Sequence, residues 1–296
     1  MTHLTITGLL VVFAQAVPAT AQTRGSIVQS QQAATVASTV HIGAGCAWIS
    51  SNHPELAPLA QVCESAMSMR QTLPNFICEQ ETRRSQPVAV MNVGRPSYRE
   101  AVDVVTAEVT YADGEERFGN IAVNGHPAAS IPANFGMWSE GEFSPVVTSI
   151  LHPMSSPELR YRGEQQMGST PVLVYDYRIA SGHNVSWAWR INGRESLPGY
   201  HGTLWVDKTT GQLRRLTRES SKDEVESWTH YVLVANDIRY DAVDIAELGK
   251  FFLPVRSELM SCERGMTFCN RNVLTFKNCR KFSAKARIIT DAPEPR

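Results

Sequence analysis

The segment that decides the fold runs from Gly199 to Phe282. It opens with two alternating runs of apolar and polar residues joined by a turn, Gly199-Tyr200-His201-Gly202-Thr203-Leu204-Trp205-Val206-Asp207, Lys208-Thr209-Thr210-Gly211 and Gln212-Leu213-Arg214-Arg215-Leu216. Three more such runs follow, Trp228 to Asp241, Phe251 to Cys262 and Asn272 to Phe282. Because strands that bury one face alternate with a period of two, this segment predicts consecutive antiparallel strands.

The alternating pattern extends toward the N-terminus as far as Phe76. Turn signals separate the runs, namely Asp113-Gly114, Asn124-Gly125 and Asn192-Gly193. Apolar residues at helical spacing precede them from Leu56 to Leu73, and a short helix is predicted after Ser144-Pro145. We therefore predict a mainly β (β-rich α+β) fold. Its one antiparallel sheet is strongly curved or a half-open barrel, with the amphipathic helix on the concave face; a closed barrel is the alternative.

Composition and the first residues bear on compartment and partners. The chain has 296 residues and a net charge of −1, which favours neither nucleic acid nor anionic lipid as a partner. Leu4 to Val17 is mostly apolar but shorter than the roughly 20 residues that span a bilayer. We expect residues 1–21 to be a signal peptide, 22–53 a flexible lead-in, 54–290 one domain and 291–296 a disordered tail. The mature protein is expected to be exported, periplasmic or extracellular, with no transmembrane span.

Six cysteines in an exported protein predict disulfides, although six allow fifteen pairings. A two-residue turn at Gly265-Met266 would place Cys262 opposite Cys269, so we predict that pair. A helix tied to the following strand gives Cys63 with Cys78, which leaves Cys46 with Cys279. Because Cys-x-x-Cys is absent and the histidines are scattered, we predict no metal site, and nothing predicts a cofactor.

The chain resembles two groups of known proteins. The helix followed by a strand with Phe76 and Gln80 resembles the start of the outer-membrane lipoprotein carrier families (LolA/LolB-like). The chain is also similar to uncharacterised exported bacterial proteins, with which it shares Leu73-Pro74-Asn75-Phe76-Ile77-Cys78, Gly141-Glu142-Phe143, Tyr200-His201-Gly202, Phe252-Leu253-Pro254 and Phe276-Lys277-Asn278-Cys279-Arg280-Lys281-Phe282. The carrier resemblance implies a half-open barrel whose concave face holds acyl chains. Neither resemblance supplies catalytic residues.

Candidate site residues are few. No Gly-x-Ser-x-Gly, Ser-x-x-Lys, His-Glu-x-x-His or phosphate-loop motif occurs, so we predict no catalytic residues. A hydrolase is the least favoured hypothesis, with Glu140, Glu142 and His201 as its candidates. The arginines of Arg83-Arg84 and Arg214-Arg215 are expected at solvated strand positions.

Three tryptophans are the candidate ligand-facing residues. Trp187 and Trp189 share one face of a predicted strand, and Trp205 stands on a neighbouring one. Aromatic side chains on one sheet face line either a pocket for an apolar ligand or an ordinary core. The favoured hypothesis is a non-catalytic exported protein that binds an apolar or lipid-like ligand. The alternative is an envelope interaction or sensor module, which contacts a protein through a sheet edge or the loop around Trp138.

Overall fold

The computed structural model describes residues 27–30, 45–51, 53–88, 97–98, 102–131, 138–143, 146–221, 224–265 and 269–282. The elements in chain order are β1 (Ile27–Ser30), η1 (Cys46–Ile49), η2 (Pro54–Leu56), α1 (Ala57–Thr72), β2 (Phe76–Ser85), β3 (Pro87–Val88), β4 (Ser97–Tyr98), β5 (Asp103–Ala112), β6 (Glu115–Val123), β7 (His126–Pro127), β8 (Trp138–Glu140), α2 (Val146–Ile150), η3 (Pro153–Ser155), β9 (Glu158–Met167), β10 (Thr170–Ile179), η4 (Ser181–His183), β11 (Ala188–Ile191), β12 (Arg194–Ser196), β13 (Tyr200–Asp207), β14 (Leu213–Ser220), β15 (Tyr231–Ile245), β16 (Gly249–Glu263) and β17 (Cys269–Lys281). The signal peptide and the C-terminal tail expected from the sequence lie outside the described residues.

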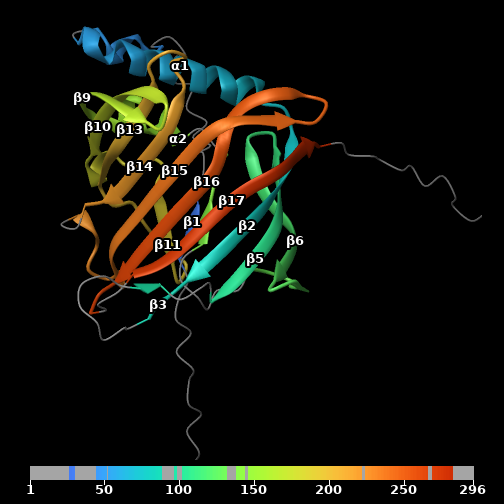
Figure 1. Ribbon diagram of the computed structural model, residues 1–296. Helices are drawn as coiled ribbons and strands as arrows, with labels where there is room; N and C mark the ends of the chain where they lie inside the picture. Colours follow the sequence, from blue (N-terminus) through green and yellow to red (C-terminus); the bar gives the residue numbers. More distant parts are fainter. Residues whose placement is uncertain are drawn as a thin grey trace, which may run out of the picture.

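The main sheet has eleven strands in the order β7-β6-β5-β2-β17-β16-β15-β14-β13-β10-β9. Every neighbouring pair is antiparallel, and most neighbours are consecutive in the chain. Two neighbouring pairs, β2 with β5 and β10 with β13, are separated in the chain only by short strands of other sheets. The long-range pair is β2 with β17, which joins the first long strand to the last. Figure 1 shows β13 to β17 side by side, with α1 across one end of the strands. The predicted mainly β antiparallel fold is confirmed.

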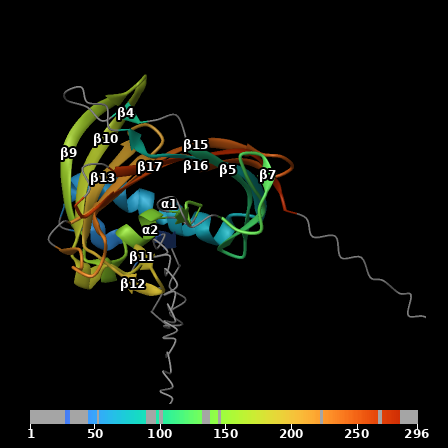
Figure 2. The ribbon, with the colours of Figure 1, turned by 90° about the horizontal axis from the view of Figure 1, so that it is seen from below.

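The strong curvature expected from the sequence was wrong, because the sheet is not strongly curled. Its edge strands β7 and β9 are not paired with each other in the described chain, so the closed barrel is not formed either. The physical reason is the bulk on one side of the sheet. Helices α1 and α2 and strands β11 and β12 all lie there (Figure 2), and a tightly curled sheet would leave no room for them.

A second sheet of four strands, in the order β12-β11-β1-β8, uses segments that the sequence analysis placed elsewhere. Trp189 was expected on a strand of the one main sheet, but its strand β11 pairs with β12 and β1. Strand β1 also pairs in parallel with β8. Both β1 and η1 fall within residues 22–53, the segment expected to be a flexible lead-in.

Helix α1 covers the face of the main sheet that we call the inner face; the opposite face is the outer face. Its buried residues follow the predicted stripe and are Leu59, Ala60, Val62, Cys63 and Ala66. The helix ends at Thr72 because Leu73, which precedes Pro74, adopts extended backbone angles. Within the described residues, no helix combines the length and apolar character needed to cross a bilayer.

The disulfides are Cys46–Cys63, Cys78–Cys279 and Cys262–Cys269. Cys262 and Cys269 are register partners on β16 and β17, as the sequence predicted. The pairs Cys63 with Cys78 and Cys46 with Cys279 were wrong. Cys63 lies on the side of α1 that faces η1, whereas an irregularity of β17 between Lys277 and Arg280 brings Cys279 beside Cys78. The Cys78–Cys279 disulfide therefore reinforces the β2–β17 pairing.

We predict that the Cys78–Cys279 disulfide stabilises the fold more than Cys262–Cys269. The two bonds close loops with sequence separations of 201 and 7 residues. Loop-closure entropy then gives about 5 kcal/mol for the first and about 2 kcal/mol for the second. Urea unfolding of the double variants Cys78→Ala/Cys279→Ala and Cys262→Ala/Cys269→Ala would measure this. Equal losses of unfolding free energy would contradict it.

Glycine is required at position 202 by close packing. A Cβ atom there would lie 1.8 Å from Thr217 O and 2.8 Å from the Tyr177 hydroxyl, which itself donates to Thr217 O at 2.8 Å. We expect Gly202→Ala to lower the unfolding free energy by about 1–3 kcal/mol or more, as overpacking does. The control is Gly119→Ala on β6, where a Cβ meets nothing within 4 Å. Thermal unfolding of both variants tests the expectation, which fails if they unfold alike.

Candidate binding site between the sheet and its helical cover

The inner face of strands β10 and β13 to β16 forms an apolar floor. Its side chains are buried in one hydrophobic cluster: Tyr175, Tyr177, Ile179, Tyr200, Leu204, Val206, Leu213, Leu216, Val234, Ile238 and Leu259. They come from alternate positions along neighbouring strands, so they are contiguous across the sheet. The floor is an apolar surface that requires cover.

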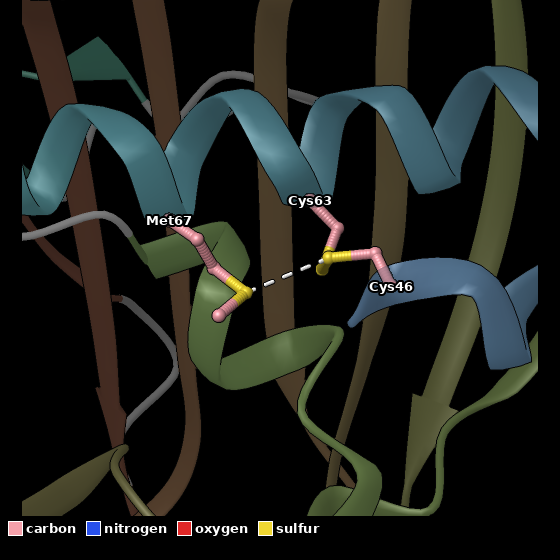
Figure 3. The surroundings of a disulfide bond; sticks show 3 residues. All are labelled: Cys46, Cys63 and Met67. Carbon is pink, nitrogen blue, oxygen red and sulfur yellow. Dashed lines mark hydrogen bonds between the residues drawn. A yellow bond between two sulfur atoms is a disulfide. The ribbon is translucent and has the colours of Figure 1, made fainter. Parts of the chain in front are cut away.

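The cover consists of η1, α1, α2 and the loop and strand that carry Trp187 and Trp189, all in the same cluster. The Cys46–Cys63 disulfide joins η1 to α1 (Figure 3). Cys46 Sγ lies 3.6 Å from Met67 Sδ, a van der Waals contact because a disulfide sulfur carries no proton. Among the described residues, no hydrogen bond joins an α1 side chain to the sheet. Helix α1 therefore contacts the sheet through apolar packing and is covalently fixed to η1.

A buried polar group lies beside the apolar floor. Glu142, which follows β8, accepts hydrogen bonds at Oε1 from Ser139 Oγ and, at 3.5 Å, from Ser257 Oγ. Asn236 Nδ2 donates to Ser257 Oγ at 2.9 Å. Asn236 is also the register partner of Arg218, which is buried with its guanidinium 4.9 Å from the centre of the Trp187 ring. This polar cluster (Ser139, Glu142, Arg218, Asn236, Ser257) is enclosed by protein.

Burial controls protonation in the polar cluster. It raises the pKa of Glu142 above its usual value, while the hydrogen bond from Ser139 and the charge of Arg218 act in the opposite direction. Burial also lowers the pKa of Arg218. The pKa of Glu140 is raised by burial and then by the neighbouring Glu142. Burial raises the pKa of Tyr200 to about 12, so this phenol stays protonated at neutral pH.

Two oxygens of the cluster have no hydrogen-bond partner among the described residues, Glu142 Oε2 and Asn236 Oδ1. Buried polar atoms are paired in the great majority of cases, and an unpaired one costs about 1–3 kcal/mol. These two oxygens are therefore positions where a hydrogen-bonding group, such as the polar end of a bound molecule, would be stabilised.

The structure brings together two of the three predicted tryptophans. Trp187 and Trp189 are fully buried with their ring centres 5.9 Å apart, and Trp187 packs on Tyr200 at 5.1 Å. The Asn184 side chain holds this loop, accepting from Trp187 N and donating to Trp187 O, each at 2.9 Å. Trp205 lies on the outer face of β13, where the Arg215 guanidinium sits 4.5 Å from its ring centre. It is therefore separated from the other two by the sheet.

The hydrolase candidates are not assembled into one site. His201 is exposed on the outer face of β13, whereas Glu142 is buried on the inner side against Ser257. Glu140 ends β8 and is half-buried. In the described part of the chain, no group of three His, Cys, Asp or Glu residues is placed to hold a metal ion.

Sequence reasoning missed the buried charges. Arg84 was expected in solvent, but it is buried and hydrogen-bonded through Nε to Asp103 Oδ1 at 2.7 Å. Arg218 was not singled out at all. A signal existed, because Arg218 continues the alternation of Leu216 and Ser220 and must share their face. Such burial is tolerable because Asp103 lies beside Arg84 and Glu142 lies near Arg218. Both acidic residues are distant in sequence from their arginines, so the sequence did not reveal these contacts.

The comparisons with known proteins give low similarities. No family model matches the chain, and no curated protein matches it. Solved structures do resemble it. An outer membrane lipoprotein-sorting protein domain from Vibrio parahaemolyticus is 8% identical, with a TM-score of 0.35, covering 79% of this chain and 93% of that one.

Two further structures resemble the chain. A DUF1329 family protein from Desulfovibrio piger is 10% identical, with a TM-score of 0.33 and coverage of 77% and 95% of the two chains. Lipoprotein LppX from Mycobacterium tuberculosis is 9% identical, with a TM-score of 0.26 and coverage of 75% and 93%. The resemblance to lipoprotein carriers noted in the sequence thus recurs among solved structures. At these scores it carries no argument about function, which rests on the site.

The raised pKa of Glu142 predicts a pH-dependent difference between the protein and its Glu142→Gln variant. Between the ordinary and the raised pKa, the folded protein holds a proton that the unfolded chain has released, so this group's stabilisation is lost as pH rises through the folded pKa. Glutamine keeps the acceptor for Ser139 without the charge. We expect Glu142→Gln to match the parent near about pH 4 and to gain roughly 2–4 °C in Tm near about pH 8.

The control for this experiment is Glu64→Gln, at an exposed position of α1. Its Tm difference from the parent should not grow with pH. If Glu142→Gln instead becomes progressively less stable than the parent as pH rises, the attraction between Glu142 and Arg218 outweighs the burial penalty and the expectation is wrong.

Proposed function

We propose that the chain is a non-catalytic exported protein that binds an apolar or lipid-like chain between the inner face of the sheet and its cover. The observation that carries the proposal is the placement of the Cys46–Cys63 disulfide. It fixes α1 to η1 and leaves α1 without a covalent cross-link to the sheet. Helix α1 and η1 can therefore shift together while the sheet, held by Cys78–Cys279, stays intact.

The energetics of such a shift favour an apolar ligand. The buried face of α1 consists of small and medium-sized side chains, so its contacts with the floor are limited in area. An acyl chain that replaced them would gain about 0.8 kcal/mol of transfer free energy for each methylene that it buries. Because helix side chains and acyl chain are both apolar, the exchange has a small net cost. In this proposal Trp187 and Trp189 contact the ligand once α1 and η1 have moved.

The polar cluster supports a ligand with one polar end. Glu142 Oε2 and Asn236 Oδ1 lie next to the apolar floor without a hydrogen-bond partner among the described residues. A hydroxyl group could donate to Asn236 Oδ1 and accept from the Glu142 carboxyl while that group holds its proton. The three disulfides are typical of a protein exported to an oxidising compartment. We propose the periplasm or the extracellular space as that compartment, where such lipid-like molecules require shielding from water.

The alternative, an envelope interaction or sensor module, is favoured at one location only. Strand β9 is an edge of the main sheet and pairs with β10 on one side. An exposed edge can accept a strand from a partner. Trp138, the other location considered, is buried on β8 with its ring centre 5.6 Å from that of Phe118. It therefore does not offer an exposed contact residue.

The direct test is mass spectrometry of lipids extracted from gently purified protein, combined with binding of a fluorescent fatty acid. The proposal expects a lipid class that co-purifies and a fatty acid that displaces it. Repeated recovery of empty protein, together with no fatty-acid binding, would exclude the proposal. Crosslinking in intact cells that yields a single protein partner and no lipid would support the edge of β9 instead.

A loosened cover should admit the ligand faster. Leu59 is fully buried on α1, and Leu59→Ala removes about 2–5 kcal/mol of packing that holds the cover on the floor. We expect fluorescent fatty-acid uptake to accelerate roughly tenfold or more, since about 1.4 kcal/mol changes an equilibrium tenfold. Stopped-flow fluorescence would measure the rate.

The matched control is Leu274→Ala, the same truncation in the second hydrophobic cluster, which contains Leu73, Phe76 and Phe276. It destabilises the sheet without loosening the contact between α1 and the floor. If both variants accelerate uptake equally, the effect reports global destabilisation and not movement of the cover.

A further inference from the structure

Three arginines stand directly opposite one another on the outer face of the sheet. Arg215 on β14 is the register partner of Arg239 on β15, and Arg239 is the register partner of Arg256 on β16. Opposite residues in antiparallel strands have Cβ atoms about 4.5–5.5 Å apart, and like charges at such positions repel. Because guanidinium groups remain charged at all ordinary pH values, the row has a fixed positive charge.

Nearby carboxylates neutralise only part of this charge. Asp237 accepts two hydrogen bonds from Arg215, at 2.9 and 2.7 Å. Glu258 accepts two from Arg271, at 2.5 and 2.7 Å, and lies 3.7 Å from Arg256 Nη2. Each carboxylate therefore already accepts two hydrogen bonds from one arginine, Asp237 from Arg215 and Glu258 from Arg271. Among the described residues, Arg239 makes no ion pair or hydrogen bond through its side chain.

The row borders a hollow whose lining has more arginines than carboxylates, which suits an anion. Arg239, Arg256 and Arg271 line it together with Asp237 and Glu258, and its volume is about 370 Å³. At about 30 Å³ for each water, this is room for roughly ten water molecules. At the β13 end of the row, the Trp205 ring packs against Arg215 and holds that guanidinium on the sheet.

We propose that this hollow is a binding site for a phosphate-type oxyanion, held by Arg239 and Arg256. Arginine presents planar N–H donors that match two oxygens of such a group, and the anion would relieve the repulsion along the row. The site lies on the opposite face from the covered floor and does not depend on the function proposed above. A phosphate group can come from free phosphate or from the headgroup of an anionic lipid.

The test for the site uses inorganic phosphate as the probe. Tm and isothermal titration would be measured in phosphate and in chloride at equal ionic strength. The protein should show a saturable rise in Tm with phosphate, and Arg239→Gln and Arg256→Gln should bind it roughly tenfold or more weakly. Without phosphate and at low salt, Arg239→Gln should be more stable than the parent, because a like charge has been removed.

The control variant is Arg162→Gln, which removes the same charge from the outer face at an arginine paired with Asp176 at 2.7 Å. It should bind phosphate as the parent does. Equal weakening in all three variants would mean a general charge effect and would overturn the proposal, as would no phosphate-dependent rise in the parent.

Vesicle flotation distinguishes the two sources of the anion. Vesicles with an anionic phospholipid and vesicles of zwitterionic lipid alone would be compared with and without inorganic phosphate. Flotation with the anionic vesicles that phosphate competes away, and that Arg239→Gln loses, identifies a lipid headgroup as the ligand. Phosphate binding without flotation identifies a soluble phosphate compound. Flotation that Arg239→Gln retains would overturn the role of the row in headgroup binding.

Discussion

The pairing of β2 with β17 is the constraint on which the rest of the structure depends. It joins the strand that follows α1 to the last strand of the meander, and so makes one sheet from both ends of the chain. The Cys78–Cys279 disulfide spans this pairing. Because β2 is fixed there, α1 must run back across the inner face, where it meets the floor formed by β13 to β16. The position of the cover is thus a consequence of a contact between residues about 200 positions apart.

Local pattern predicted the strands well because side-chain alternation is a property of each strand alone. The run from Gly199 to Phe282 gives five strands of the sheet, β13 to β17, at nearly the expected positions. It could not predict the partners of Cys63 and Cys78, since nothing local records that β17 lies beside β2. The same limit explains Trp205. Its strand was correct, but only the register with Arg215 shows that it faces away from Trp187.

Buried charge was the least predictable part of the site. Arg84 and Arg218 each occupy an inner-face position, and each is tolerated because a partner from a distant segment compensates it. Asp103 accepts from Arg84, and Glu142 and the Trp187 ring lie near Arg218. Replacing such groups by apolar side chains is often neutral or stabilising. Stability alone therefore does not account for these two buried arginines.

The same strands carry different chemistry on their two faces. On β14, Leu216 and Arg218 face the cover, whereas Arg215 faces the outer hollow; on β15, Ile238 lies between Asp237 and Arg239 in sequence but on the opposite side of the sheet. One sheet backbone separates the apolar floor from the row of arginines. Because the backbone of this layer is held by ladders on both sides of each strand, a shift of α1 need not move it. In the proposed function α1 and η1 are the parts that move, and the arginine row would keep its geometry whether the inner face is covered by the helix or by a ligand.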